Sequence, residues 1–212
     1  MQIAIIGNGR MGRWFAEYFR KKGFVVSVYE KENKLDDIYL ANYVMVAVTL
    51  DKTDDVLRQI TGKVHADQIV FDIASVKSHI INEIKKLKCR IASIHPMFGE
   101  SAKDLKGQEV VIISNIGKKA EHEEMKGLFK EARLSQMTVE EHDKMMAYSQ
   151  VLPYLLALTF GRMTKGKKLI EPPVFQMQKK VYEKVMEEEE MVKQIIMLNP
   201  YAKEVAKEIG KG

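Results

Sequence analysis

The stretch QIAIIGNGRMG (residues 2–12) joins an apolar run to a glycine-rich turn. The run at residues 2–6 is short and continuous, which is typical of a strand buried on both faces of a sheet. Glycines follow at Gly7, Gly9 and Gly12, and the amphipathic pattern of residues 11–22 predicts a helix. The chain therefore begins with a strand, a tight glycine turn and a helix.

The G-x-G-x-x-G spacing in this position is a dinucleotide-binding fingerprint. The first glycine allows the tight turn, the second lets the backbone approach a pyrophosphate, and the third lets the helix pack closely on the strand. The N–H groups of the first helical turn then face the phosphates. We expect this turn to bind the cofactor through Gly7, Asn8, Gly9, Arg10, Met11 and Gly12.

Glu30 supplies the acid that such a turn requires further along the chain. It follows the second apolar run, and its spacing from Gly7 is close to the roughly 20 residues expected. A carboxylate here accepts the ribose hydroxyls and repels the 2′-phosphate of NADP, so we expect NAD, with Lys31 admitting some NADP. The alternative is a solvated acid after a strand. Thr49, after the third run, completes the expected cofactor contacts.

Similar apolar runs recur through the first two thirds of the chain, with amphipathic segments such as residues 78–87 between them. The runs lie at residues 25–29, 43–48, 68–71, 90–94 and 109–113, with a last candidate strand at 134–137. The pattern predicts an α/β fold, a doubly wound Rossmann domain over residues 1–137.

The remainder of the chain reads as helical. Thr138 and Glu141 have the spacing of a capping box, and apolar residues then recur at helical spacing as far as Met163. Pro153 is expected to kink this helix, and the glycine and prolines within residues 165–173 predict a loop. Residues 138–212 should form a smaller all-α domain.

Composition narrows the class of protein. The 212 residues are 46% hydrophobic and 30% charged, as in a soluble globular protein. The net charge is +5, but the lysines are interleaved with acids, which favours small anions over nucleic acid as partners. We find no apolar span of about 18 residues, so we expect a cytoplasmic chain without a membrane segment. Cys89 is the only cysteine, and no metal site is expected.

Two further motifs follow predicted strands, DIASVK at residues 72–77 and HPMFG at residues 95–99. Ligands bind at the carboxyl ends of such strands, where the motifs should converge. Taken singly, Ser75 could be a helix cap and His95 a turn residue. The other histidines, His65, His79 and His122, are expected to be exposed, and His142 to support a helical turn.

Taken in order, the glycine turn, these two motifs and His142-Asp143 followed by Ala147 resemble the prephenate dehydrogenase family over residues 1–202. The resemblance implies that His95 is the catalytic base and that Ser75 forms a hydrogen bond near it. It also implies oxidation of prephenate to 4-hydroxyphenylpyruvate with loss of carbon dioxide, and a helical domain that closes the substrate cleft and forms a homodimer.

The sequence departs from the family pattern in the helical part. Tyr154, after Gln150, stands where the family commonly has a histidine. The family's arginine that clamps the ring carboxylate falls near Glu183 or Lys184, and we expect Lys184 to substitute for it. We expect Gln150, Tyr154 and Lys184 to bind substrate, although Lys184 could equally be a solvated helix lysine. The helical part also ends early, so the chain could be a reduced member or one module of a longer, fused polypeptide.

Three other functions stay open at this point. An arogenate dehydrogenase performs the same chemistry on an amino-acid side chain. Another NAD(P)-dependent reductase of small carboxylated substrates would not need the His95 motif. A non-catalytic module would bind NAD without turnover.

Overall fold

A computed structural model describes residues 1–30 and 35–210, so Lys31 lies outside the described residues. The chain divides into two compact units, Met1–His142 and Asp143–Gly212, here called the first and second units. Each unit contains a hydrophobic cluster of its own.

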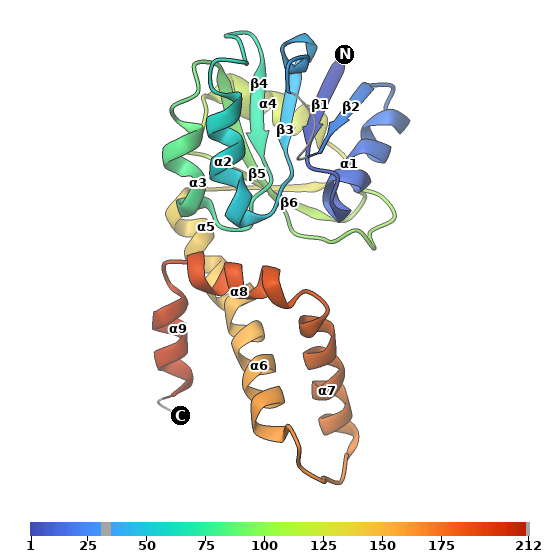
Figure 1. The fold of residues 1–212 in the computed structure, drawn as a ribbon, viewed down its shortest axis with the longest axis vertical. Helices are drawn as coiled ribbons and strands as arrows, with labels where there is room; N and C mark the ends of the chain where they lie inside the picture. Colours follow the sequence, from blue (N-terminus) through green and yellow to red (C-terminus); the bar gives the residue numbers. More distant parts are fainter. Residues whose placement is uncertain (31–34, 211–212) are drawn as a thin grey trace. The chain divides into compact units, whose positions relative to one another are not determined.

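The first unit is built on one seven-stranded sheet with the strand order β2-β1-β3-β4-β5-β6-β7 (Figure 1). Every neighbouring pair is parallel except β5 and β6. The strands are β1 (Gln2–Ile6), β2 (Val25–Tyr29), β3 (Tyr43–Val46), β4 (Ile69–Asp72), β5 (Arg90–Pro96), β6 (Glu109–Ile113) and β7 (Arg133–Met137).

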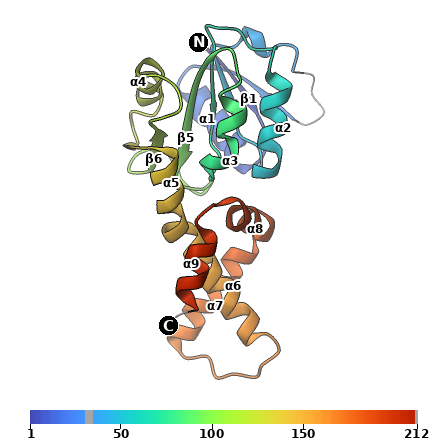
Figure 2. The same ribbon diagram turned by 90° about the vertical axis from the view of Figure 1, so that its left-hand side faces the viewer.

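Helices cover both faces of this sheet, and every residue of the central strands β3 and β4 is buried. On one face, Phe15 and Phe19 pack with Phe129 against β1, β3 and β4. The helices of the unit are α1 (Arg10–Lys21), η1 (Ile38–Leu40), α2 (Leu50–Ile60), α3 (Lys77–Ile84) and α4 (Lys119–Leu128), with α5 (Val139–Met146) at its end. Figure 2 shows α2 and α3 on the side of the sheet opposite to α4.

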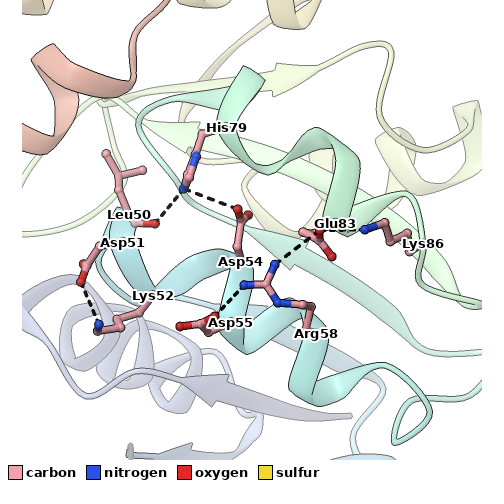
Figure 3. Close-up of polar contacts among 9 residues, drawn as sticks. All are labelled: Leu50, Asp51, Lys52, Asp54, Asp55, Arg58, His79, Glu83 and Lys86. Atoms are coloured by element: carbon pink, nitrogen blue, oxygen red, sulfur yellow. Dashed lines mark hydrogen bonds and ion pairs between the residues drawn. The ribbon is translucent and has the colours of Figure 1, made fainter.

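Polar contacts hold α2 and α3 together (Figure 3). His79 Nε2 lies 3.2 Å from the Leu50 carbonyl oxygen and 3.8 Å from Asp54 Oδ2. Arg58 on α2 pairs with Asp55 at 2.6 Å and with Glu83 on α3 at 3.4 Å. These contacts partly bury His79, which the sequence placed on the surface.

The antiparallel strand β6 departs from the expected parallel order. Residues 97–108, which join β5 to β6, contain no helix. A strand that returns parallel to its neighbour usually does so through a crossover helix, and this connection without a helix instead turns the chain back beside β5.

The second unit is helical, as expected. Its elements are a π-helical turn, η2 (Ala147–Val151), followed by α6 (Leu152–Thr164), α7 (Pro173–Met186), α8 (Glu189–Leu198) and α9 (Ala202–Ile209). The helices α6 and α7 approach closely at Gly161. A Cβ at this position would lie 2.1 Å from the Tyr182 ring, so the contact requires glycine. Ala157, Val185 and Val192 form the buried cluster of the unit.

Local signals in the sequence explain where these helices begin. Thr138 N donates to Glu141 Oε2 at 2.8 Å and Glu141 N donates to Thr138 Oγ1 at 3.2 Å, which confirms the capping box at the start of α5. Pro153 follows the π-helical turn directly, and the backbone stays helical from α5 through this turn into α6. Pro153 therefore lies inside one continuous helical run, and the kink expected there stays a prediction.

The structure confirms an α/β Rossmann-like sheet followed by a helical region. Within the described residues, no helix is both long and apolar enough to cross a membrane.

Candidate active site

The glycine turn between β1 and α1 is shaped by close backbone contacts. Gly7 has φ +117°, and a Cβ at this position would lie 2.3 Å from the Ala47 carbonyl oxygen. A Cβ on Gly12 would lie 1.9 Å from the Gly7 carbonyl oxygen. A Cβ on Gly9, by contrast, would meet no atom of the described chain within 4 Å. Gly7 and Gly12 are therefore required by packing, whereas Gly9 leaves the approach to the turn open.

The N-terminus of α1 suits an anionic group. Gly9 is the N-cap, and within the described residues no side chain caps the helix and no acid lies in its first turn. Arg13 Nη1 donates to the Asn8 carbonyl oxygen at 3.2 Å, and Arg10 Nη1 lies 3.3 Å from Glu100 Oε1. Open space at Gly9, helix N–H groups and nearby arginines fit the pyrophosphate of a dinucleotide.

Glu30 lies beside this turn, at the end of β2. Asn8 Nδ2 donates to Glu30 Oε1 at 2.6 Å, so the glycine turn itself orients the carboxylate. Thr49 is exposed at the N-terminus of α2, directly after the carboxyl end of β3. The sheet thus brings the predicted cofactor residues to one edge.

His95 lies near the carboxyl end of β5 and is only 5% exposed. Its Nδ1 lies 2.9 Å from Nε2 of His142 on α5. Burial, the neighbouring His142 and the Lys77 ammonium hold the pKa of His95 well below its ordinary value of 6.5. The ring is therefore neutral near pH 7, the form in which an imidazole accepts a proton.

A buried ion pair lies next to this histidine. Lys77 Nζ donates to Asp72 Oδ1 at 2.8 Å and to the Ile94 carbonyl oxygen at 2.6 Å, with both charged side chains 0% exposed. Asp72 ends β4 and Lys77 begins α3, so one lysine ties together β4, β5 and α3. Removing either charge would leave the other buried without a compensating charge, which destabilises the fold.

The HPMFG segment is anchored on α1. The ring of Phe98 lies 4.9 Å from the ring of Trp14, centroid to centroid, and Trp14 Nε1 donates to the Ala102 carbonyl oxygen at 2.6 Å. The helix that begins at the glycine turn therefore also supports the chain after His95.

The structure adds to what the sequence predicted for other residues of the first unit. Ser75 is half-buried, and the hydrogen bond of the described His95 ring is made to His142, so the expected bond of Ser75 near His95 stays a prediction. His122 is buried, not exposed, because its Nε2 bonds to the Ile116 carbonyl oxygen at 2.8 Å. The contact between His142 and His95 was not predicted, and the sequence signal for it is the place of His142 in the His-Asp motif.

In the second unit, two of the predicted substrate residues contact each other. Gln150 Nε2 donates to the Tyr154 hydroxyl oxygen at 3.4 Å, and within the described residues Gln150 Oε1 is buried without a partner. Burial raises the pKa of Tyr154, so its hydroxyl stays protonated. Lys184 is 72% exposed and pairs with Glu187 at 2.6 Å. Each of these residues remains a candidate for substrate binding.

A mostly parallel sheet with a tight glycine turn, an open helix N-terminus and an oriented acid after β2 defines the nucleotide-binding class of α/β proteins. A family model described as "Prephenate dehydrogenase, nucleotide-binding domain" matches residues 16–132. The chain belongs to the prephenate/arogenate dehydrogenase family.

Curated relatives share the sequence over much of this chain. One, named "Probable arogenate/prephenate dehydrogenase", from Methanocaldococcus jannaschii, is 29% identical over 78% of this chain and 43% of its own length. Another, from Schizosaccharomyces pombe, is named "Probable prephenate dehydrogenase [NADP(+)]" and is 26% identical over 76% of this chain and 42% of its own length. The chain spans less than half the length of these relatives.

A solved structure supports the same fold. The crystal structure of prephenate dehydrogenase from A. aeolicus, in complex with hydroxyphenyl propionate and NAD+, superposes with a TM-score of 0.81. It covers 100% of this chain and 87% of that chain at 17% sequence identity. This likeness concerns the fold, including the helical region after the sheet.

Proposed function

We propose that this chain catalyses the NAD-dependent oxidative decarboxylation of prephenate to 4-hydroxyphenylpyruvate. The observation that carries the proposal is the position and state of His95. It lies near the carboxyl end of β5, on the same edge of the sheet as the glycine turn, and burial keeps its ring neutral. Membership of the prephenate/arogenate dehydrogenase family supports a dehydrogenase reaction in which this histidine is the base.

His95 accepts the proton of the ring hydroxyl while the hydrogen on the same carbon leaves as hydride. NAD, when bound, accepts that hydride. The ring carboxylate then departs as carbon dioxide, and its bonding electrons complete the aromatic ring and place negative charge on the ring oxygen. His95 returns its proton to this oxygen, so the histidine ends the reaction as it began.

The remaining predicted residues supply binding. Asn8 and Glu30 hold the adenosine ribose, and the N–H groups of α1 face the pyrophosphate. Ser75 supports the reacting hydroxyl next to His95. Lys184 would bind a substrate carboxylate by exchanging its partner Glu187 for the ligand.

Arogenate is the second candidate substrate, because the relative from Methanocaldococcus jannaschii carries both activities in its name. The two substrates share the ring chemistry that His95 performs and differ in the side chain. The pair formed by Gln150 and Tyr154 is the proposed contact to that side chain.

The test is a direct comparison of the two substrates. Purified chain is mixed with NAD and either prephenate or arogenate, and NADH absorbance is followed. We expect the higher kcat/KM with prephenate, and a loss of roughly 100-fold in kcat for His95→Asn, the scale of a general base. Faster oxidation of arogenate would reassign the substrate, and oxidation of neither compound would contradict the proposed function.

A further inference from the structure

Two buried imidazole rings meet at the end of β5. His95 Nδ1 lies 2.9 Å from His142 Nε2, and the ring planes are inclined by 69° with centroids 5.1 Å apart. His95 is 5% exposed and His142 is 0% exposed. The two ring edges therefore meet nitrogen to nitrogen, with their planes inclined, in the interior of the first unit.

A hydrogen bond between two imidazole nitrogens contains one proton, so one ring donates and the other accepts. If Nδ1 of neutral His95 carries the proton, its Nε2 has a free lone pair and can act as a base. If Nε2 of His142 carries the proton instead, neutral His95 is protonated on its own Nε2 and cannot. The direction of this bond decides which nitrogen of His95 is basic.

We propose that His142 is a positioning residue that accepts a hydrogen bond from Nδ1–H of His95 and thereby holds Nε2 of His95 as the catalytic base. This inference rests on the proposed function, in which His95 takes a proton from the substrate. His142 acts only through the His95 ring and does not touch the substrate. A serine protease uses an aspartate in the equivalent way to fix the tautomer of its histidine.

The charged groups around His95 agree with a neutral ring. His142 faces it from α5, and Lys77 approaches it from α3 with its ammonium fixed by Asp72 of β4. Burial, His142 and Lys77 all lower the pKa of His95, in that order of size. A neutral imidazole has one ring proton, and within the described residues the bond to His142 is the contact that selects its position.

The kinetic test compares two substitutions in the full chain. His142→Phe keeps a flat ring but removes the acceptor, whereas His142→Gln places an amide oxygen near the position of Nε2. We expect His142→Phe to lower kcat by roughly 10- to 100-fold, the usual cost of losing an orienting partner, with KM and NAD affinity changed by less than about twofold. His142→Gln should restore most of kcat.

His122→Phe is the matched control. His122 is also buried, and its Nε2 bonds to a carbonyl oxygen on the Ile116 backbone at 2.8 Å. This substitution should lower the melting temperature without changing kcat, because the His122 ring bonds to the Ile116 backbone and not to the His95 ring. A folded His142→Phe protein with wild-type kcat would overturn the proposal.

The tautomer itself can be measured without turnover. Nitrogen-15 NMR of the His95 ring in the wild-type chain should show a protonated Nδ1 and a bare Nε2, and His142→Phe should shift this population. A wild-type ring protonated on Nε2 would overturn the inference. If the chain oxidises neither prephenate nor arogenate, the proposed function fails, and the NMR measurement still decides the role of His142.

Discussion

His95 shows at the scale of a single residue how burial sets chemistry. Its folded pKa lies well below 6.5, whereas in the unfolded chain the ring binds a proton near that value. Activity should therefore rise with pH through an ionisation well below 6.5 and stay constant above it. A profile centred at or above 6.5 would contradict the neutral buried ring.

The same shift predicts a pH-dependent stability. Below pH 6.5 the His95 ring is protonated in the unfolded chain but stays neutral in the folded chain. The free energy of unfolding therefore falls as the pH is lowered from 6.5 towards the folded pKa. The slope from this group approaches about 1.4 kcal/mol per pH unit. Urea denaturation at several pH values measures it, and subtracting the His95→Asn curve isolates the contribution of His95.

Glu30 is predicted to set the preference for NAD. Its carboxylate, held by Asn8 at 2.6 Å, would face the 2′-phosphate of NADP with like charge. Glu30→Gln should therefore raise NADP affinity by roughly 10-fold and lower NAD affinity only slightly, as measured by titration. Glu17→Gln, at an exposed site on α1, removes the same charge and should change neither affinity. If both variants raised NADP affinity equally, the cause would be the change in net charge and not the position of Glu30.

Lys184 and Lys193 form a matched pair in the second unit. Each is an exposed helix lysine paired with a glutamate, Lys184 with Glu187 at 2.6 Å and Lys193 with Glu189 at 2.7 Å. If Lys184 binds a substrate carboxylate, Lys184→Ala should raise KM for prephenate by roughly 10-fold, with NAD affinity unchanged. Lys193→Ala should leave both KM for prephenate and NAD affinity at their wild-type values. The same result for Lys184→Ala would show that Lys184 is a solvated surface lysine that does not bind substrate.

Among the structural elements, the glycine turn contains one glycine that packing requires, Gly12, and one expected to serve cofactor binding, Gly9. Gly12→Ala forces a Cβ to within 1.9 Å of the Gly7 carbonyl oxygen, so we expect a loss of about 3 kcal/mol in the free energy of unfolding. Gly9→Ala meets no described atom within 4 Å, so folding should survive while NAD affinity falls by roughly 10-fold or more.

Gly127 in α4 provides the control for these substitutions. A Cβ there also meets no described atom within 4 Å, and an alanine in a helix is favoured over glycine by about 0.5–1 kcal/mol. Gly127→Ala should therefore stabilise the chain slightly and leave NAD binding unchanged. Normal NAD affinity in Gly9→Ala would show that the dinucleotide does not approach the turn at this point.

At the scale of the whole molecule, we expect a homodimer formed by the second unit. Large apolar side chains are exposed on α6, on α7 and between them. Single apolar residues on a surface are normal, but a group of them on neighbouring elements is typical of an interface. They are Leu156, Met163, Leu169, Ile170, Val174, Met177 and Val181.

The test for a dimer is a change of charge on this surface. The double substitution Val174→Lys and Met177→Lys should weaken self-association by roughly 100-fold or more, as measured by sedimentation. Leu40→Lys, at a 56% exposed leucine of the first unit, is the control and should leave the dimer intact. A wild-type chain that sediments as a monomer at all concentrations would contradict the expectation.

Features that depend on local spacing could be predicted from the order of residues alone. The glycine fingerprint predicted the turn between β1 and α1, alternating apolar runs predicted the strands, and Thr138 with Glu141 predicted the start of α5. Each of these follows from contacts within a few residues, or from a periodicity that any isolated segment displays. The α/β class and the helical region after it could therefore be predicted from the sequence.

The surroundings of His95 could not be predicted, because they form from segments that are far apart in the chain. The bond to His142 joins residues 47 positions apart, and the buried pair of Lys77 with Asp72 depends on how α3 packs over β4 and β5. The reversal of β6 likewise follows from a connection without a helix. Burial, and with it the pKa of the histidine, arises when distant elements pack together, and no local pattern of residues reports that packing.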